Sequence, residues 1–153
     1  MFIDKSGKYL SLAVHLCMKL KQLTYLHIFF WIVYILAAIV FPGLANGFSN
    51  LIFDVTFFTI SFTCFYINYF FIVPLFFHSD KIYKSVFAFI ISISLFVIMR
   101  YLVEESFLPT FFGVRNYKEG TSFSYYFFDN IFYSSTTIFI STAFWFFRYF
   151  IIT

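Results

Sequence analysis

The sequence predicts an all-α membrane protein, a bundle of four transmembrane helices with both termini in the cytosol. Of the 153 residues, 62% are hydrophobic and 11% are charged, whereas soluble domains have about 45–50% and ~25%. Aromatic side chains make up 28% of the chain, more than one small soluble core hides. This composition excludes a soluble globule and a disordered chain, and it makes the lipid bilayer the expected surrounding.

Four long apolar runs follow one another along the chain. A helix needs about 20 apolar residues to cross ~30 Å of hydrocarbon, and each run has near that length. Lipid cannot satisfy open sheet edges, and the alternating polarity of a β-barrel is absent, so the runs predict helices. We expect these helices at about residues 23–41, 51–77, 82–103 and 125–153.

Prolines are expected to interrupt these runs, because proline lacks an N–H and clashes with the preceding turn. Pro42 should end the first helix and Pro74 should kink the second. The longest connection, residues 105–124, is rich in phenylalanine, which favours a segment lying in the membrane interface.

Residues 1–22 form a basic segment around a short apolar stretch of about half a bilayer span. Lys-Leu-Lys follows where a secretory signal would need a cleavage site. We interpret the segment as a basic cytosolic leader or interfacial helix, which leaves residues 23–153 as the transmembrane domain. Met18 is a plausible natural start, in which case the preceding residues are an extension.

The distribution of Lys and Arg predicts the orientation of the chain. Cytosolic loops carry an excess of these residues, and here seven lie on one side and two on the other. The seven on the predicted cytosolic side are Lys5, Lys8, Lys19, Lys21, Lys81, Lys84 and Arg148, and the two outside are Arg115 and Lys118.

Two stripes of polar residues run along the second and fourth helices. Asp54, Ser61 and Asn68 recur every seven residues, a spacing that drifts only about 20° per step and keeps them on one face. We interpret both stripes as inward-facing packing contacts. A conduit is the alternative, but neither stripe offers a charge near the midplane. The candidate intramembrane packing residues are Ser61, Asn68, Asn130, Ser134, Thr137 and Ser141.

Charged residues gather where three of the predicted helices reach the outer side. Arg100 and Glu104 stand at i, i+4, and we expect Arg100 to pair with Glu104, or with Asp54 or Asp129 across the bundle. One interpretation is that these charges lie at the membrane interface and are solvated there. The other is that they form an ion-paired cluster at which a ligand or proton changes the packing of the helices. Both interpretations stay open. The candidate sensory cluster is Asp54, Arg100, Glu104, Glu105 and Asp129.

No residue pattern indicates catalysis. The five glycines form no phosphate-binding run, and no Ser/His/Asp set can be placed. Cys17 and Cys64 lack metal-ligand spacing, and the three histidines are scattered. We therefore predict no enzyme activity, no cofactor and no metal. The basic residues are too few for a nucleic-acid partner.

Five short segments of the sequence together carry a resemblance to a known protein family. They lie at residues 27–31, 65–74, 100–105, 112–117 and 126–130. Together they resemble the N-terminal membrane domain of bacterial sensor histidine kinases of the LytS-like type, over about residues 18–150. The resemblance implies a multi-pass protein of the bacterial cytoplasmic (inner) membrane, a homodimer, a cytosolic kinase module and a LytTR-type response regulator.

The chain departs from that family in two places. No proline precedes a histidine, so the phosphorylation box is missing, and Leu75 stands where the resemblance implies a basic residue. The predicted function is a membrane-embedded sensory or anchor domain that passes an external or membrane signal to a kinase module this chain lacks, as an excised domain or a truncated product. The alternatives are a small polytopic transporter or channel subunit, or a structural membrane partner.

Overall fold

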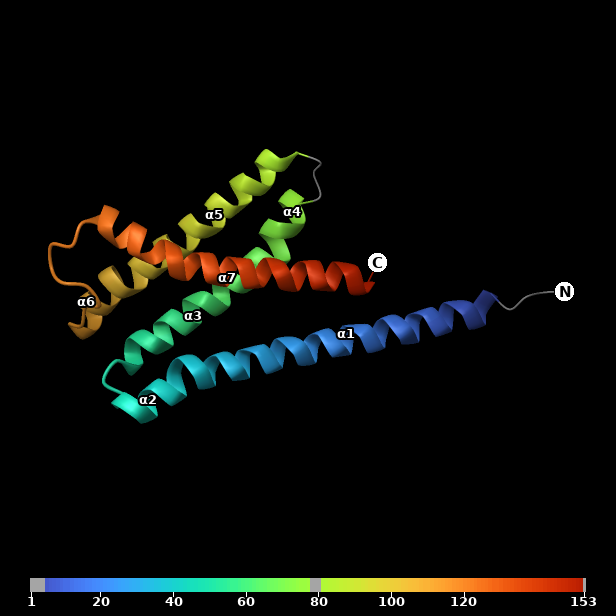
Figure 1. The fold of residues 1–153 in the computed structure, drawn as a ribbon, viewed down its shortest axis with the longest axis horizontal. Coiled ribbons are helices and arrows are strands. Elements are labelled where there is room, and N and C mark those ends of the chain that lie inside the picture. The colour runs from blue at the N-terminus through green and yellow to red at the C-terminus, as the bar shows by residue number, and fades with distance from the viewer. Residues whose placement is uncertain (1–4, 78–80, 153) are drawn as a thin grey trace.

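The computed structural model describes residues 5–77 and 81–152, and within these ranges the chain forms helices and no strands. The helices make four passes that alternate in direction (Figure 1). The first pass is α1 (Lys5–Ile35), η1 (Leu36–Val40) and α2 (Phe41–Asn46); the second is α3 (Leu51–Ile67), η2 (Asn68–Ile72) and α4 (Val73–Phe77); the third is α5 (Ile82–Tyr101), η3 (Leu102–Phe107) and α6 (Leu108–Phe112); the fourth is α7 (Phe123–Ile152).

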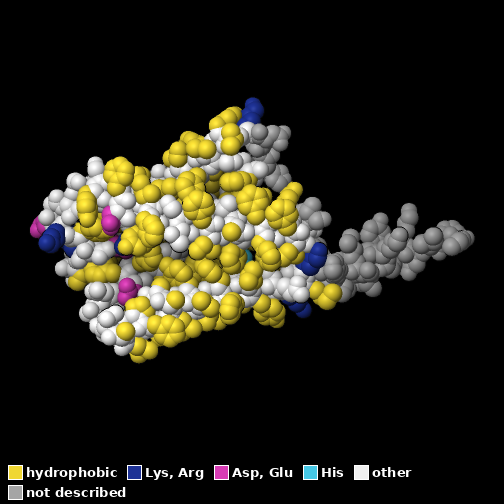
Figure 2. Space-filling view, viewed as in Figure 1, with side chains coloured by type: hydrophobic (Ala, Val, Ile, Leu, Met, Phe, Trp, Pro, Cys, Tyr) yellow, Lys and Arg dark blue, Asp and Glu magenta, His cyan; other side chains and the backbone are white. Residues whose placement is uncertain are grey.

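All four passes contain a helix long and apolar enough to cross a membrane. Large aromatic and aliphatic side chains are exposed along the outside of all four passes. Figure 2 shows this apolar surface, with the visible charged groups near its two ends. Such a surface is solvated by lipid rather than by water. The four spans are Cys17–Asn46, Leu51–Phe77, Ile82–Phe112 and Phe123–Ile152.

The first and third passes are longer than the sequence predicts. The first continues past Pro42 to Asn46, and the third continues past Val103 to Phe112. The predicted interfacial segment at residues 105–112 is therefore a continuation of the third pass. In addition, α1 is continuous through residue 22, so the predicted leader and the first membrane pass form one helix.

Proline accounts for the irregular turns within these passes. In the second pass the Val73 N–H bonds to the Asn68 carbonyl, five residues back, immediately before Pro74. The other two π-helical segments precede Pro42 and Pro109 in the same way. A proline ring clashes with the carbonyl four residues back, and a wider turn moves that carbonyl aside. The prolines are thus accommodated inside the passes instead of ending them.

Glycine ends the first and third passes. Gly113 has a φ of +67°, and its N–H donates to the Pro109 carbonyl at 3.2 Å. Gly47 has a φ of +84° and donates to Gly43 in the same way at 2.9 Å. Left-handed conformations such as that of Gly113 are easy only for glycine, which lacks a Cβ. These two residues place the connections 47–50 and 113–122 at one end of the bundle, called here the loop end.

The core lies where α3, α5 and α7 pack together, and α1 lies along α3 and α7 (Figure 1). One cluster joins Trp31 of α1 to Phe65 of α3 and Trp145 of α7. A second joins Cys64 of α3 to Phe96 of α5. These contacts fix the level of each helix relative to its neighbours, and thereby bring the polar groups at the loop end together.

Candidate functional site

A buried ion pair lies at the centre of the loop end. The Nε of Arg100, in α5, donates to the Oε1 of Glu104, in η3, at 2.9 Å. Arg100 is 7% exposed and Glu104 is fully buried. A buried charge is tolerated when an opposite charge and hydrogen bonds compensate its lost hydration. Of the three partners that the sequence offers Arg100, the structure selects Glu104.

Arg100 also links the third pass to the second and fourth passes. Its Nη1 donates to the Oδ1 of Asn130 in α7. Its guanidinium carbon lies 4.9 Å from the ring centre of Phe57, in α3, and 5.6 Å from that of Tyr133, in α7. Both distances permit a cation–π attraction. One side chain therefore touches all three helices of the core.

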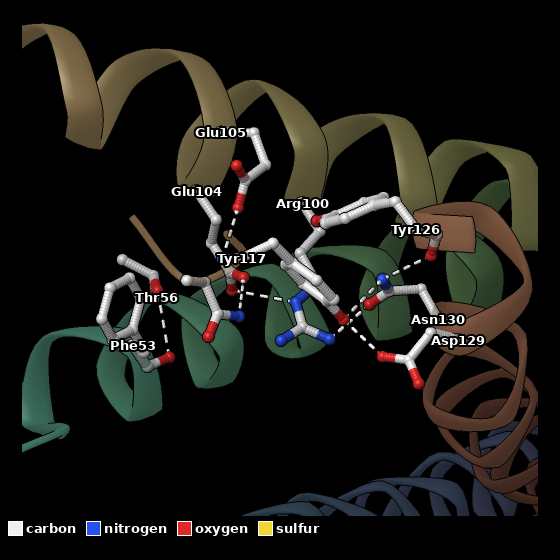
Figure 3. A network of polar contacts seen from close by, with 10 residues as sticks. Phe53, Thr56, Arg100, Glu104, Glu105, Tyr117, Tyr126, Asp129 and Asn130 are labelled. Carbon is white, nitrogen blue, oxygen red and sulfur yellow. Dashed lines mark hydrogen bonds and ion pairs between the residues drawn. The ribbon is translucent and has the colours of Figure 1, made fainter. Parts of the chain in front are cut away.

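Residues of the loop 113–122 bond to the carboxylates beside Arg100, and Figure 3 shows Tyr117 of this loop next to the pair. Asn116 donates from Nδ2 to the second carboxylate oxygen of Glu104 at 2.7 Å. The backbone N–H of Tyr117 donates to the Oε1 of Glu105 at 3.1 Å. Two consecutive loop residues thus hold the two consecutive glutamates of η3.

Tyr117 connects the same loop to the start of α7. Its hydroxyl donates to the carboxylate of Asp129, and it accepts from the Nδ2 of Asn130 at 3.4 Å (Figure 3). Burial raises the pKa of Tyr117, and the hydrogen bond to Asp129 raises it further. Tyr117 therefore remains a neutral donor to Asp129 at physiological pH.

Asp54 stands apart from the hydrogen-bonded network. It lines an open cavity of about 470 Å³ together with Arg100, Arg115 and Asn116. Within the described residues Asp54 forms no ion pair with Arg100. The cavity offers one carboxylate and two guanidinium groups beside the network, an arrangement suited to binding a polar ligand.

The candidate packing residues lie inside the bundle, where Asn68 makes contacts with two neighbouring passes. Its Nδ2 donates to the Ile138 carbonyl at 3.4 Å and to the Thr142 hydroxyl at 3.2 Å, both in α7. Its Oδ1 accepts from the Ser92 hydroxyl of α5 at 2.8 Å. Asn68 therefore joins three passes in the apolar interior.

The other packing residues are also buried. Ser141 donates to the Phe65 carbonyl across the helix interface at 2.7 Å, while Ser134 and Thr137 bond to carbonyls of their own helix. The buried hydroxyl of Ser61 lines a mostly apolar cavity of about 160 Å³. Only part of the polar stripe therefore makes contacts between helices.

The sequence does not reveal a third polar group, around His27. The hydroxyl of Tyr66 lies 3.3 Å from the His27 Nδ1 and accepts from the Trp31 Nε1 at 3.2 Å. The His27 and Tyr66 rings are stacked with centres 5.7 Å apart. The i, i+4 spacing of His27 and Trp31 is a sequence signal for a shared face, but it does not identify Tyr66 as their partner.

The fold and the site define a protein with four apolar helical passes that fits a multi-pass membrane protein. Its polar groups form hydrogen bonds and an ion pair between the passes and the loop, and no three His, Cys, Asp or Glu side chains of residues 17–77 and 81–152 could hold a metal ion. Comparison of the chain with protein-family models, with curated proteins and with solved structures finds no match.

Proposed function

We propose that the chain is the membrane-embedded sensory or anchor domain of a bacterial two-component sensor histidine kinase. The resemblance of its sequence to LytS-like kinases supports this assignment. The observation that carries it is the Arg100 network, in which a partly buried bond joins the loop 113–122 to Glu104 and buried bonds join Arg100 to Glu104 and to Asn130 of α7. In this proposal a signal at the loop end changes how those two helices pack.

The geometry offers a physical route for such a signal. A ligand in the cavity beside Arg100 would compete with Glu104 or Asn130 for the guanidinium. Either competition changes the contact between α5 and α7. Because α7 is one uninterrupted helix from Phe123 to Ile152, a rotation at Asn130 would be carried roughly 33 Å along it at 1.5 Å per residue.

The remaining parts of the assignment follow from the same proposal. The chain would lie in the bacterial cytoplasmic membrane, with its termini in the cytosol and a second copy as its partner. The phosphorylation chemistry would belong to a cytosolic kinase module, which would act on a response regulator. We assign no catalytic step to this chain.

A fusion experiment tests this function. The chain is joined through α7 to the cytosolic module of a LytS-like kinase, and transcription from the cognate regulator's promoter is measured in the parent and in Glu104→Gln and Asn130→Leu variants. We expect output to change by about fivefold or more, since couplings between sites typically amount to ~1–3 kcal/mol. Lys118→Ala is the matched control, because it removes an exposed charge from the same loop.

Unchanged output from both cluster variants, at equal membrane levels, would contradict the sensory proposal. The transporter or channel subunit then becomes the better candidate. It is less well supported, because the Arg100 and Asn68 networks lie at different levels and are separated by apolar residues such as Ile60, Cys64 and Phe96. Solute flux into liposomes that contain the chain distinguishes it from a structural partner.

A further inference from the structure

The end of the bundle opposite the loop end is called here the basic end, because its described residues include lysine and arginine but no carboxylate. Among the described residues, every carboxylate lies at the loop end, on α3, η3, the loop 113–122 or the start of α7. In the view of Figure 2, the visible acidic side chains lie at the loop end. The described basic residues at the basic end are Lys19, Lys21, Lys81, Lys84 and Arg148.

Arg148 lies about one helical turn before the end of α7 at Ile152. It is half-buried on α7, and its guanidinium carbon lies 5.7 Å from the ring centre of Tyr69. Tyr69 is also a hydrogen-bond partner of Arg148, and no carboxylate among the described residues forms an ion pair with it. A guanidinium held among apolar side chains near a membrane surface requires an anion or water to compensate its charge.

Lys19 lies beside the C-terminal end of α7. Its Nζ donates to the Ile151 carbonyl of α7 at 2.6 Å, where a cation also offsets the negative end of the helix dipole. Arg148 lies three residues before Ile151, about 4.5 Å deeper along the helix axis. The nearby rings of Trp145 and Tyr149 are of the types that concentrate at the headgroup level. These neighbours are the types expected around a residue near the headgroup level.

Two open cavities meet at Arg148. The first has a volume of about 440 Å³ and is lined by Phe70, Pro74 and Trp145. The second has a volume of about 330 Å³ and is lined by Leu20, Thr24 and His27 on its other walls. Each is more than twice the ~150 Å³ that accommodates a benzene ring, so both have room for part of a lipid.

We propose that Arg148 binds the phosphate of an anionic phospholipid, whose apolar part occupies the adjoining cavities. A guanidinium matches the geometry of phosphate oxygens, and the surrounding lysines favour a lipid with net negative charge over a zwitterionic one. The apolar walls at Phe70 and Pro74 fit an acyl chain and would leave a free phosphate ion in contact with hydrocarbon side chains. This proposal is independent of the sensory function.

Quenching of tryptophan fluorescence by brominated lipids tests the proposal. The chain has two tryptophans, so Trp31→Phe leaves Trp145, which lines the first cavity, as the only reporter. The full chain in this background is reconstituted into mixed vesicles with bromine on either phosphatidylglycerol or phosphatidylcholine. We expect stronger quenching by the phosphatidylglycerol.

The preference should depend on Arg148. Adding Arg148→Gln should reduce it by about fivefold, the change expected from ~1 kcal/mol per basic residue at a membrane surface. Arg148→Lys keeps the charge and should retain part of the preference for phosphatidylglycerol. It replaces the glutamine variant in the test if that variant fails to insert into the vesicles. Lys118→Gln is the matched control, because it removes one positive charge at the loop end, and it should leave the preference unchanged.

Three outcomes would overturn the proposal. The first is equal quenching by the two lipids in the Trp31→Phe chain. The second is an unchanged preference in both Arg148 variants. The third is loss of the preference when millimolar inorganic phosphate is added at constant ionic strength, which would make the site one for a free phosphate ion.

Discussion

Arg100 Nε and Glu104 Oε1 lie 2.9 Å apart, one helical turn from each other, and neither side chain reaches solvent freely. The remaining oxygen of Glu104 is held by Asn116, and a terminal nitrogen of Arg100 is held by Asn130. Each charge therefore depends on the other for compensation. This mutual dependence makes the pair the most sensitive point of the loop end.

Removing either member of the pair should destabilise the protein. Arg100→Gln or Glu104→Gln leaves one buried charge without its partner, which costs about 3–5 kcal/mol. The double variant should cost less than the sum of the two single changes, because no charge is stranded. Unfolding of the detergent-solubilised chain measures both effects. Lys118→Ala should stay within about 0.5 kcal/mol of the parent, and single variants no less stable than this control would disprove burial of the pair.

Asn68→Leu should lower stability by about 1–2 kcal/mol, given ~0.6 kcal/mol for an average interhelical hydrogen bond in a membrane protein. The change removes the bonds to Thr142 and to the Ile138 carbonyl, and it frees Ser92. Thr59→Val is the control, since Thr59 is exposed on the same helix and bonds only to its own backbone. The same unfolding experiment compares the stability of the two variants. Equal losses would mean that the hydrogen bonds of Asn68 to the neighbouring passes do not stabilise the bundle.

Tyr117 should make stability depend on pH in the alkaline range. Its pKa in the folded chain lies above the ordinary value of 10.0, so the folded state holds the phenol proton more tightly than the unfolded state. The resulting stabilisation is fully present below about pH 10 and is lost as pH rises above it. The difference in unfolding free energy between the parent and Tyr117→Phe should therefore shrink above about pH 10.

Phenolate absorbance gives an independent check on Tyr117. The difference between the parent and Tyr117→Phe titrations isolates this residue from the other tyrosines. It should rise only above the ordinary tyrosine range. A difference titrating at the ordinary value would mean that the hydroxyl is not held by Asp129.

The positive-inside rule predicts the orientation of the four passes. Reporter fusions after Gly47 and Gly120 should report the periplasmic side, and fusions after Lys81 and Ile152 the cytosolic side. Paired alkaline phosphatase and green fluorescent protein fusions measure this directly. A cytosolic signal from the Gly120 fusion would mean that the loop end faces the cytosol, and the loop end could then not receive an external signal.

Much of the fold follows from local features of the sequence. Length and apolar composition predict four helices, and the second agrees with the predicted range 51–77 at both ends. Heptad spacing places Ser61 and Asn68 on one helix face, because such spacing depends only on the geometry of a single helix. Ser61 and Asn68 are both buried in the structure.

Contacts between distant segments do not follow from such local rules. Asn116 and Tyr117 look like ordinary polar residues of a loop, and their bonds to Glu104 and Glu105 arise from the way the loop folds back over η3. The pairing of His27 with Tyr66 depends on the relative level of two helices, which helical periodicity leaves undetermined. Of these contacts, the bond from Asn116 to Glu104 is one on which the function proposed above depends.

The π-helical segments before Pro42, Pro74 and Pro109 indicate where homologous sequences should differ from this chain by one residue. A turn closed across five residues holds one residue more than a turn closed across four, so every side chain beyond it is displaced by about 100° around the helix axis. Loss of one residue there would restore an ordinary turn and still leave two apolar stretches of spanning length. When homologous sequences are aligned with this chain, single-residue gaps should therefore concentrate at residues 36–40, 68–72 and 102–107.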